Sequence, residues 1–371
     1  MVIYPKIFAD YQQRSFQSQT TSGDGQKLWF TPTRDTIDRN PPTLILVTEN
    51  GLAVQYVNYL QWMNTEGAVA WQIERDPGMR ILSHDGTTFF LDPDGDVYGV
   101  DAKKDFVLKE FFIPNSTDRG AIYLFQPRGD GRYLIQTYNT AEEVEEEVEH
   151  QPDDHNLMLQ GSGGWSDWKW LLEFEGKVLP CLLTSDLNSA VQLDNTGRVR
   201  IVDVESGEQT GEFVIEGAVF ADASLDREDA LLIHLLTAER ERRLCRYSLE
   251  GALLWEYPLP PGEPRSVAQP PAVDANNRVY LLWNNFLLAF DNGELIWQYP
   301  LSTPKYFQYV TIMGDNTLLA ASGNMLCHLD TSGEPIFTQF LPPGEEISTP
   351  PVVDTAGRIF VGTAAGIYCF K

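Results

Sequence analysis

A repeated Gly-x-x-x-Trp pattern is the sequence feature that most limits how this chain can fold. Where copies adjoin, they recur with a period of about 42 residues, and the interval between Gly67 and Gly251 equals about four such periods plus a surplus of roughly 16 residues. Such a period predicts a repeat protein rather than several unrelated domains. The five copies are Gly25/Trp29, Gly67/Trp71, Gly251/Trp255, Gly293/Trp297 and Gly333/Phe337.

Each unit reads as four short strands that are rich in β-branched and aromatic residues and are separated by turns of Asp, Asn and Gly. A four-stranded sheet cannot bury both of its faces alone, whereas stacking such sheets around an axis buries both. The large, rigid Trp can then fill the space between neighbouring sheets. The Gly four residues earlier suits a tight turn with positive φ. These features predict an all-β fold, a β-propeller.

The two ends of the chain complement each other. The last unit stops at Lys371, in the place that Asp291 holds in "LLAFDNGELIW", and the missing continuation resembles "TSGDGQKLWF" near the N-terminus. Residues 26–30 are therefore predicted to pair with "GIYCF" at the C-terminus and to close the ring. From Ser22 to Lys371, less the surplus segment, the chain is long enough for about eight such units.

The predicted architecture is a single eight-bladed β-propeller of four-stranded antiparallel blades, with seven blades as the alternative. Residues 1–20 form an N-terminal extension, residues 21–371 the propeller, and residues 140–156 an acidic insertion within it.

The unit "PPVVDTAGRIFVGTAAGIY", taken together with "DNGELIW", resembles the pyrroloquinoline-quinone-like (PQQ-like) β-propeller repeat. The resemblance is clearest over residues 248–371 and in the N-terminal strand. It implies the propeller fold, but not one activity. The repeat builds quinone-dependent dehydrogenases, and it also builds non-catalytic scaffolds such as the lipoprotein propeller of the outer-membrane assembly machinery. The dehydrogenases bind calcium, and many carry an adjacent Cys-Cys pair. This chain has no such pair, so the non-catalytic type without a cofactor is expected.

The charge limits the classes of partner. The chain has 53 acidic and 27 basic residues, a formal net charge of −26, which repels nucleic acid and anionic lipid surfaces. Basic proteins or cations are the favoured partners. The first residues show no signal peptide, lipid anchor or membrane-spanning pattern, so a cytoplasmic location with reduced cysteines is expected. In the repeat alignment the four cysteines occupy packing positions, which predicts buried thiols: Cys181, Cys245, Cys327 and Cys369.

No catalytic, cofactor-binding or metal-binding residue is predicted. Asp92, Asp94, Asp96 and Asp101 resemble a calcium loop but lack EF-hand spacing, and they fall where every unit has a turn and a strand. The five histidines are scattered, and none has a partner at ligand spacing. A propeller can still assemble a site from distant loops around its axis.

One segment departs from the repeat and carries the functional prediction. It lies between the second and third strands of a blade, and it is interpreted either as a solvated loop or as a docking loop for a basic partner. The protein is therefore predicted to be a non-catalytic scaffold for protein binding. The alternative is an enzyme or small-ligand binder with a site at the axial mouth. The predicted partner-binding residues are Glu142, Glu143, Glu145, Glu146, Glu147, Glu149, Asp153 and Asp154.

Overall fold

The computed structural model describes residues 21, 23–32, 41–48, 51–56, 59–74, 80–84, 87–91, 96–100, 106–112, 120–127, 133–139, 155–160, 168–174, 181–194, 196–219, 223–261, 270–301 and 308–371.

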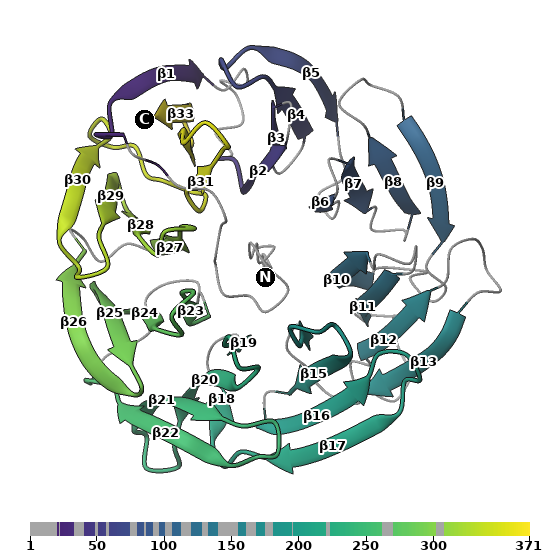
Figure 1. Ribbon diagram of the computed structural model, residues 1–371. Helices are drawn as coiled ribbons and strands as arrows, with labels where there is room; N and C mark the ends of the chain where they lie inside the picture. The colour runs from purple at the N-terminus through teal and green to yellow at the C-terminus, as the bar shows by residue number, and fades with distance from the viewer. Residues whose placement is uncertain are drawn as a thin grey trace, which may run out of the picture. The chain divides into compact units, whose positions relative to one another are not determined.

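The described chain is entirely built of β-strands and their turns (Figure 1). Within these residues the strands form eight sheets, seven of four strands and one of five, and every strand pair with a defined register is antiparallel. The predicted all-β class of four-stranded antiparallel units is thereby confirmed. None of the described residues belongs to a helix that is long and apolar enough to cross a bilayer.

The contacts divide the chain into two compact units. Unit 1 comprises Met1–Arg75, Phe220–Ser248 and Leu253–Lys371, and unit 2 comprises Asp76–Val219 and Leu249–Ala252.

The first sheets of unit 1 in chain order are β2(Leu44–Thr48) β3(Gly51–Gln55) β4(Tyr59–Met63) β5(Val69–Glu74), and then β18(Ala218–Val219) β19(Ser224–Leu225) β20(Leu231–Leu236) β21(Arg242–Tyr247) β22(Leu253–Pro258), of which β18 belongs to unit 2. The next two are β23(Ala272–Val273) β24(Val279–Trp283) β25(Phe286–Asp291) β26(Glu294–Pro300) and β27(Gln308–Ile312) β28(Leu318–Ser322) β29(Met325–Leu329) β30(Pro335–Phe340). The last consists of β31(Val352–Val353) β32(Ile359–Thr363) β33(Gly366–Phe370) with β1(Lys27–Pro32).

The sheets of unit 2 are β6(Arg80–His84) β7(Thr87–Leu91) β8(Asp96–Val100) β9(Phe106–Phe112); β10(Gly120–Pro127) β11(Tyr133–Asn139) β12(His155–Gln160) β13(Trp168–Phe174); and β14(Leu182–Leu183) β15(Ser189–Leu193) β16(Arg198–Asp203) β17(Gln209–Val214). Their strands run in simple sequential order, as the repeat predicts.

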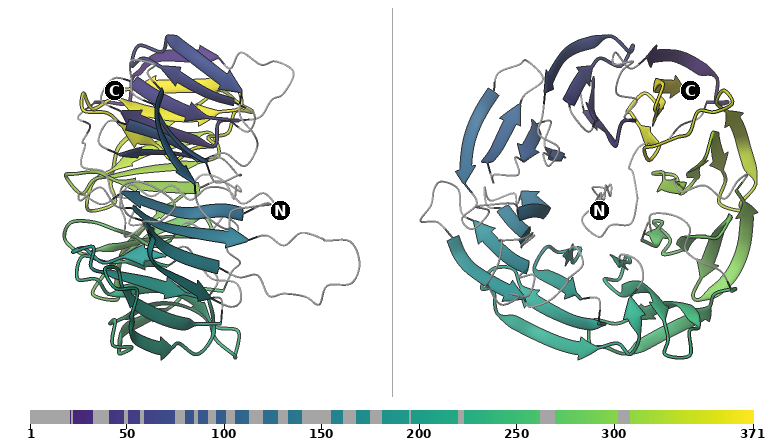
Figure 2. Two further views of the ribbon diagram at one scale, coloured as in Figure 1. Left: turned by 90° about the vertical axis from the view of Figure 1, so that its right-hand side faces the viewer. Right: turned by 180° about the vertical axis from the view of Figure 1, so that it is seen from behind.

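The first strand of the chain joins the last sheet. β1 pairs antiparallel with β33, from Lys27 opposite Phe370 to Pro32 opposite Gly366. Gln26 and Lys371 extend the pairing by exchanging two backbone hydrogen bonds of 2.8 and 2.9 Å. The predicted pairing of residues 26–30 with the C-terminal strand is thus present, and Figure 2 shows β1 beside the C-terminal strand from behind. We call β31–β33 with β1 the seam sheet. That all eight sheets form one closed ring stays a prediction.

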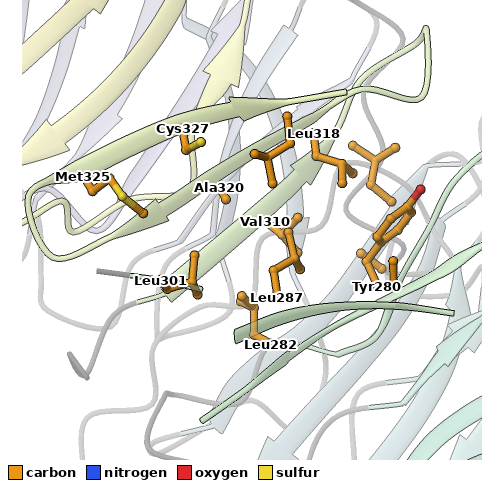
Figure 3. Close-up of a cluster of buried hydrophobic side chains, with 13 residues drawn as sticks. Tyr280, Leu282, Leu287, Leu301, Val310, Leu318, Ala320, Met325 and Cys327 are labelled. Atoms are coloured by element: carbon orange, nitrogen blue, oxygen red, sulfur yellow. The ribbon is translucent and has the colours of Figure 1, made fainter. Parts of the chain in front are cut away.

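Successive sheets of unit 1 pack face to face. One buried cluster lies between the β23–β26 and β27–β30 sheets, where Tyr280 and Leu287 of the first sheet meet Val310 and Leu318 of the second (Figure 3). Similar clusters join β20 and β21 to the β23–β26 sheet, and β27–β30 to the seam sheet. Another joins the seam sheet to β2–β5. Both faces of the inner strands are buried, which explains their continuous apolar runs.

The outermost strands alternate between exposed and half-buried residues. In β26 the side chains of Leu295, Trp297 and Tyr299 are half-buried, and their neighbours are exposed. These strands present a free backbone edge, and β1, β22 and β26 each end on a proline. Proline cannot donate to an added strand, so it discourages edge-to-edge association.

Candidate functional site

The predicted docking loop lies outside the described residues, because residues 140–154 are not described. The strands that flank it are β11 and β12, the second and third strands of their sheet, with Tyr138 opposite His155. The insertion therefore leaves the sheet where the sequence placed it. Its predicted end at residue 156 is two residues too late, since His155 and Asn156 belong to β12. The binding role of its eight carboxylates stays a prediction.

The predicted calcium-like turn is mostly outside the described residues as well. Asp96 is the first residue of β8, whereas Asp92, Asp94 and Asp101 are not described. The described residues contain no group of three or more His, Cys, Asp or Glu side chains that could hold a metal ion.

The Gly-x-x-x-Trp pattern marks junctions between successive sheets. At these junctions an aromatic ring lies against the glycine of the following unit. A Cβ atom added to Gly67, Gly293 or Gly333 would lie 2.6–2.9 Å from the nearest atom of the preceding unit, and ring atoms of Trp29, Trp255 or Trp297 are among its closest neighbours. Phe213 covers Gly251 and Phe337 covers Gly25 in the same way.

Trp71 contacts a ring of its own sheet. The unit that follows it reads "VDAKKDF" and has no glycine at the corresponding turn on which a ring could lie. The Trp71 ring stacks on Trp62 of the adjacent strand β4, with ring centroids 5.8 Å apart. Its Nε1 is buried, and no described residue accepts a hydrogen bond from it. The side chains of the following unit lie outside the described residues, so the packing of Trp71 between sheets stays a prediction.

The repeated glycines also need the left-handed backbone region. Gly25, Gly67, Gly251, Gly293 and Gly333 have φ between 79° and 86°. Glycine is thus required at these turns twice, by its backbone conformation and by the ring above it.

An arginine and a tryptophan share one carbonyl at two of these junctions. The Thr331 carbonyl accepts hydrogen bonds from Trp297 Nε1 at 3.2 Å and from Arg278 Nη1 at 3.3 Å. At the junction of the seam sheet with β2–β5, the Thr65 carbonyl accepts from Trp29 Nε1 and Arg358 Nη1, both at 3.1 Å. Each Thr is two residues before the glycine of its turn.

Both arginines follow a buried aspartate by four residues. Asp274 and Asp354 are 0% and 4% exposed, and the Oδ1 atom of each accepts two backbone N–H groups of its own turn. Arg358 Nε also donates to Asp354 Oδ2 at 2.7 Å. Sequence reasoning missed this arrangement. The signal was visible as Asp-x-x-x-Arg in "VDANNRVY" and "VDTAGRIF".

These turns lie at one end of the sheets of unit 1. The turns between first and second strands are linked across sheets, because the backbone N–H groups of Arg227 and Ala275 donate to the side chains of Asn277 and Asn316 in the next sheet. The turns between third and fourth strands lie at the same end, since the strands alternate in direction. We call this end of unit 1 the turn face. Its turns are residues 64–68, 226–230, 274–278, 291–294, 313–317, 330–334 and 354–358.

The turn face carries exposed carboxylates. Two of its arginines are engaged by acidic partners: Arg246 binds buried Asp226 and exposed Glu228, and Arg358 binds Asp354 and lies 3.6 Å from Glu66. Three further acidic residues are exposed and form no ion pair within the described residues, namely Glu294, Asp315 and Glu334. The face therefore has an excess of negative charge.

The opposite end of unit 1 has a different composition. Several of its described segments consist mainly of Pro, Asn and small or aromatic residues, such as "PLPP" at 258–261, "WNNF" at 283–286 and "FLPPG" at 340–344, and its acidic residues are fewer, among them Glu239, Glu241, Glu345 and Glu346. The carboxylate of Glu345 accepts hydrogen bonds from the Tyr368 hydroxyl at 2.9 Å and from the Thr363 hydroxyl at 3.1 Å. Acidic side chains are thus concentrated on the turn face.

The cysteines belong to the core. All four are free thiols and buried, as the repeat alignment predicted. Burial raises the pKa of Cys181, Cys245 and Cys369 to about 12, so these thiols are protonated and poorly nucleophilic at neutral pH.

The two described buried histidines are also core residues. Burial, and then the charge of Arg242, lower the pKa of His234 to about 4. His328 is 1% exposed, and burial lowers its pKa as well. Both imidazoles are therefore neutral at physiological pH.

Comparison with known proteins places the fold. No protein-family model and no curated protein matches the sequence. Among solved structures, BamB from Moraxella catarrhalis matches with a TM-score of 0.57 at 12% identity, over 93% of this chain and 96% of that one. The fold is that of a PQQ-like β-propeller.

Enzymes share this fold. The quinohemoprotein alcohol dehydrogenase from Comamonas testosteroni matches with a TM-score of 0.63 at 11% identity, over 99% of this chain and 80% of that one. A europium-containing methanol dehydrogenase matches with a TM-score of 0.62 at 10% identity, over 100% and 97%. Identities this low indicate a common fold and not a common activity. The function of this chain therefore has to be inferred from the residues on its own surface.

Proposed function

We propose that this PQQ-like propeller is a protein-binding scaffold whose partner presents a basic surface. The observation that carries the proposal is the turn face. Arg246 and Arg358 are held by buried aspartates, while exposed carboxylates remain in excess on the turns of successive sheets. Preorganised charge of one sign favours a partner of the other sign and accelerates its encounter.

The rigidity of these turns supports a binding role. Asn277 and Asn316 have φ of 65° and 66°, and each accepts a backbone hydrogen bond from the preceding sheet. The backbones of these turns are therefore held at positions fixed by the junctions. A partner would not have to order the turns on binding, although it would order the exposed carboxylate side chains.

The acidic insertion extends the proposal to a second element. Its eight carboxylates account for a large part of the net charge of −26, and they lie in one short segment of the chain. We assign it the role of steering a basic partner toward the scaffold, because long-range attraction acts mainly on association rate. A cytoplasmic location belongs to the same proposal and follows from the sequence interpretation.

Affinity capture from the native cell extract tests the proposal, with mass spectrometry of the bound proteins. The turn-face variant Glu294→Gln/Glu334→Gln removes two charges from side chains that make no described hydrogen bond, and Glu239→Gln/Glu216→Gln removes the same charge elsewhere. The captured partner should associate about tenfold more slowly with the turn-face variant at low salt, and the control should resemble the wild type.

Replacing residues 141–154 by a short Gly-Ser turn is the second arm. It should leave the melting temperature nearly unchanged, because surface loop length affects stability weakly. It should also flatten the salt dependence of association. A partner that binds all four proteins equally, at low and moderate salt, would disprove the proposal.

A further inference from the structure

The seam sheet differs from its neighbours in how its outer strand is attached. In unit 1 the outer strands β5, β22, β26 and β30 each follow their own third strand through a short turn. Among the outer strands described in this unit, β1 alone has no such turn. It is connected to the seam sheet only through non-covalent contacts, and its first residue, Lys27, pairs with Phe370 at the other end of the chain.

The seam sheet offers β1 a complementary edge. Five residue pairs align β1 with β33, and the Phe30 ring lies tilted against that of Tyr368, with ring centroids 4.5 Å apart. Lys27 Nζ lies 5.7 Å from the centre of the Tyr368 ring.

The neighbouring sheet supplies a socket for Trp29. Its ring lies on Gly67, and its Nε1 donates to the Thr65 carbonyl. On the side of the seam sheet, its centroid is 5.9 Å from that of Phe360 in β32. Two residues later the Thr31 hydroxyl donates to the Gly67 carbonyl at 2.7 Å. A side chain smaller than Trp would leave the socket partly empty.

The residues before β1 are fixed as well. Thr21 is 5% exposed, and its hydroxyl donates to the Gly357 carbonyl at 2.7 Å. Gly23 lies so close to the last residue that a Cβ atom there would be 1.8 Å from the carbonyl carbon of Lys371. The site is therefore specific at several positions between residues 21 and 32, because it requires a small residue, an aromatic residue and two hydroxyls at set places.

We propose that this edge is a strand-exchange site, which can take residues 21–32 of a second copy of the chain in place of its own. The second copy is the occupant because its sequence reproduces every contact described above. No covalent turn has to break for the exchange. The connection from Pro32 to Pro42 has about ten residues, at most about 35 Å when extended. Because Ser348 Oγ binds the Pro42 carbonyl, a reciprocal exchange must bring the two seam sheets within that distance.

Exposed apolar side chains at the rim support this choice of occupant. Leu28 and Phe30 on β1 are 46% and 36% exposed, and Ile336 and Phe340 on the adjacent outer strand β30 are 50% and 61% exposed. A reciprocal exchange would bring these residues of two copies together and cover them. The proposal is independent of the basic partner proposed for the turn face.

Rescue in trans tests the exchange on the full chain. The variant Trp29→Ala weakens the intramolecular strand but leaves the acceptor edge intact. A fluorescent synthetic peptide of residues 20–34 should bind this variant saturably and raise its melting temperature, whereas the same peptide with Trp29→Ala should bind at least tenfold more weakly. If the full-length variant does not fold, as judged by circular dichroism, Thr31→Val is the milder replacement. A folded variant that shows no saturable peptide binding up to about 1 mM, the range of intramolecular effective concentrations, would overturn the proposal.

Discussion

Gly333→Ala tests whether the repeated glycine is needed for its backbone conformation, for the ring above it, or for both. Gly333 has φ of +86°, and an added Cβ would lie 2.7 Å from Cδ2 of Trp297. The left-handed conformation costs an alanine about 1–2 kcal/mol. Forcing a methyl group against a packed ring adds about 1–3 kcal/mol. The expected loss is therefore about 2–5 kcal/mol of unfolding free energy.

Gly344→Ala is the matched control. Gly344 has φ of +90°, but no atom lies within 4 Å of its added Cβ. It should lose only the conformational part, about 1–2 kcal/mol. Urea unfolding followed by tryptophan fluorescence and circular dichroism measures both variants.

A double-mutant cycle isolates the contact. In a Trp297→Ala background, Gly333→Ala should cost no more than Gly344→Ala, because the ring that obstructs the methyl group is gone. Equal losses for Gly333→Ala and Gly344→Ala in the wild-type background would refute the reasoning. The junction would then depend on backbone conformation alone.

Three further predictions concern the ends of the chain, one histidine and the cofactor. Deleting residues 1–31 should lower the free energy of unfolding by on the order of 5 kcal/mol and cause aggregation, since it removes the Trp29 contact and exposes the edge of β33. Deleting residues 1–15 should lower it far less. Equal melting temperatures of both truncations and the full chain would contradict the role of the seam sheet. Because the pKa of His234 is lowered to about 4, its contribution to stability is present above pH 6.5 and is lost progressively as the pH falls to 4. The expected loss at pH 5 is about 2 kcal/mol. Urea unfolding at pH 7 and pH 5 should show this loss in the wild type and a smaller one in His234→Phe. Titration with pyrroloquinoline quinone and calcium should change neither absorbance nor melting temperature; a saturable shift at micromolar quinone would favour a dehydrogenase-like activity at the axial mouth.

The repeat made most of the fold predictable from the sequence. The spacing of Gly293 and Gly333 indicated the length of one unit, and the match between the two chain ends predicted the pairing of β1 with β33. Both depend on local patterns that recur from unit to unit. Local detail was less reliable where the pattern weakens. The unit after Trp71, for example, lacks the glycine that would receive its ring.

The turn face could not be predicted in the same way. Glu294 and Glu334 belong to successive repeats and look like ordinary polar turn residues in the sequence. Only the stacking of their sheets places them on one surface. The Asp274 and Arg278 pair was equally hidden, because its importance lies in the Thr331 carbonyl of the next sheet. The acidic insertion was conspicuous in the sequence for the opposite reason, since its charges are contiguous.

The pairing of β1 with β33 has a consequence for synthesis of the protein on the ribosome. Lys27 emerges early, but its partner Phe370 is translated 343 residues later. At about 5–20 residues per second, synthesis of the intervening chain takes roughly 20–70 seconds. Throughout that time Trp29 and Phe30 have no β33 to pack against, and their strand is an unpaired apolar edge. The nascent β1 therefore needs protection until β33 has been made, either by a chaperone or by low local concentration.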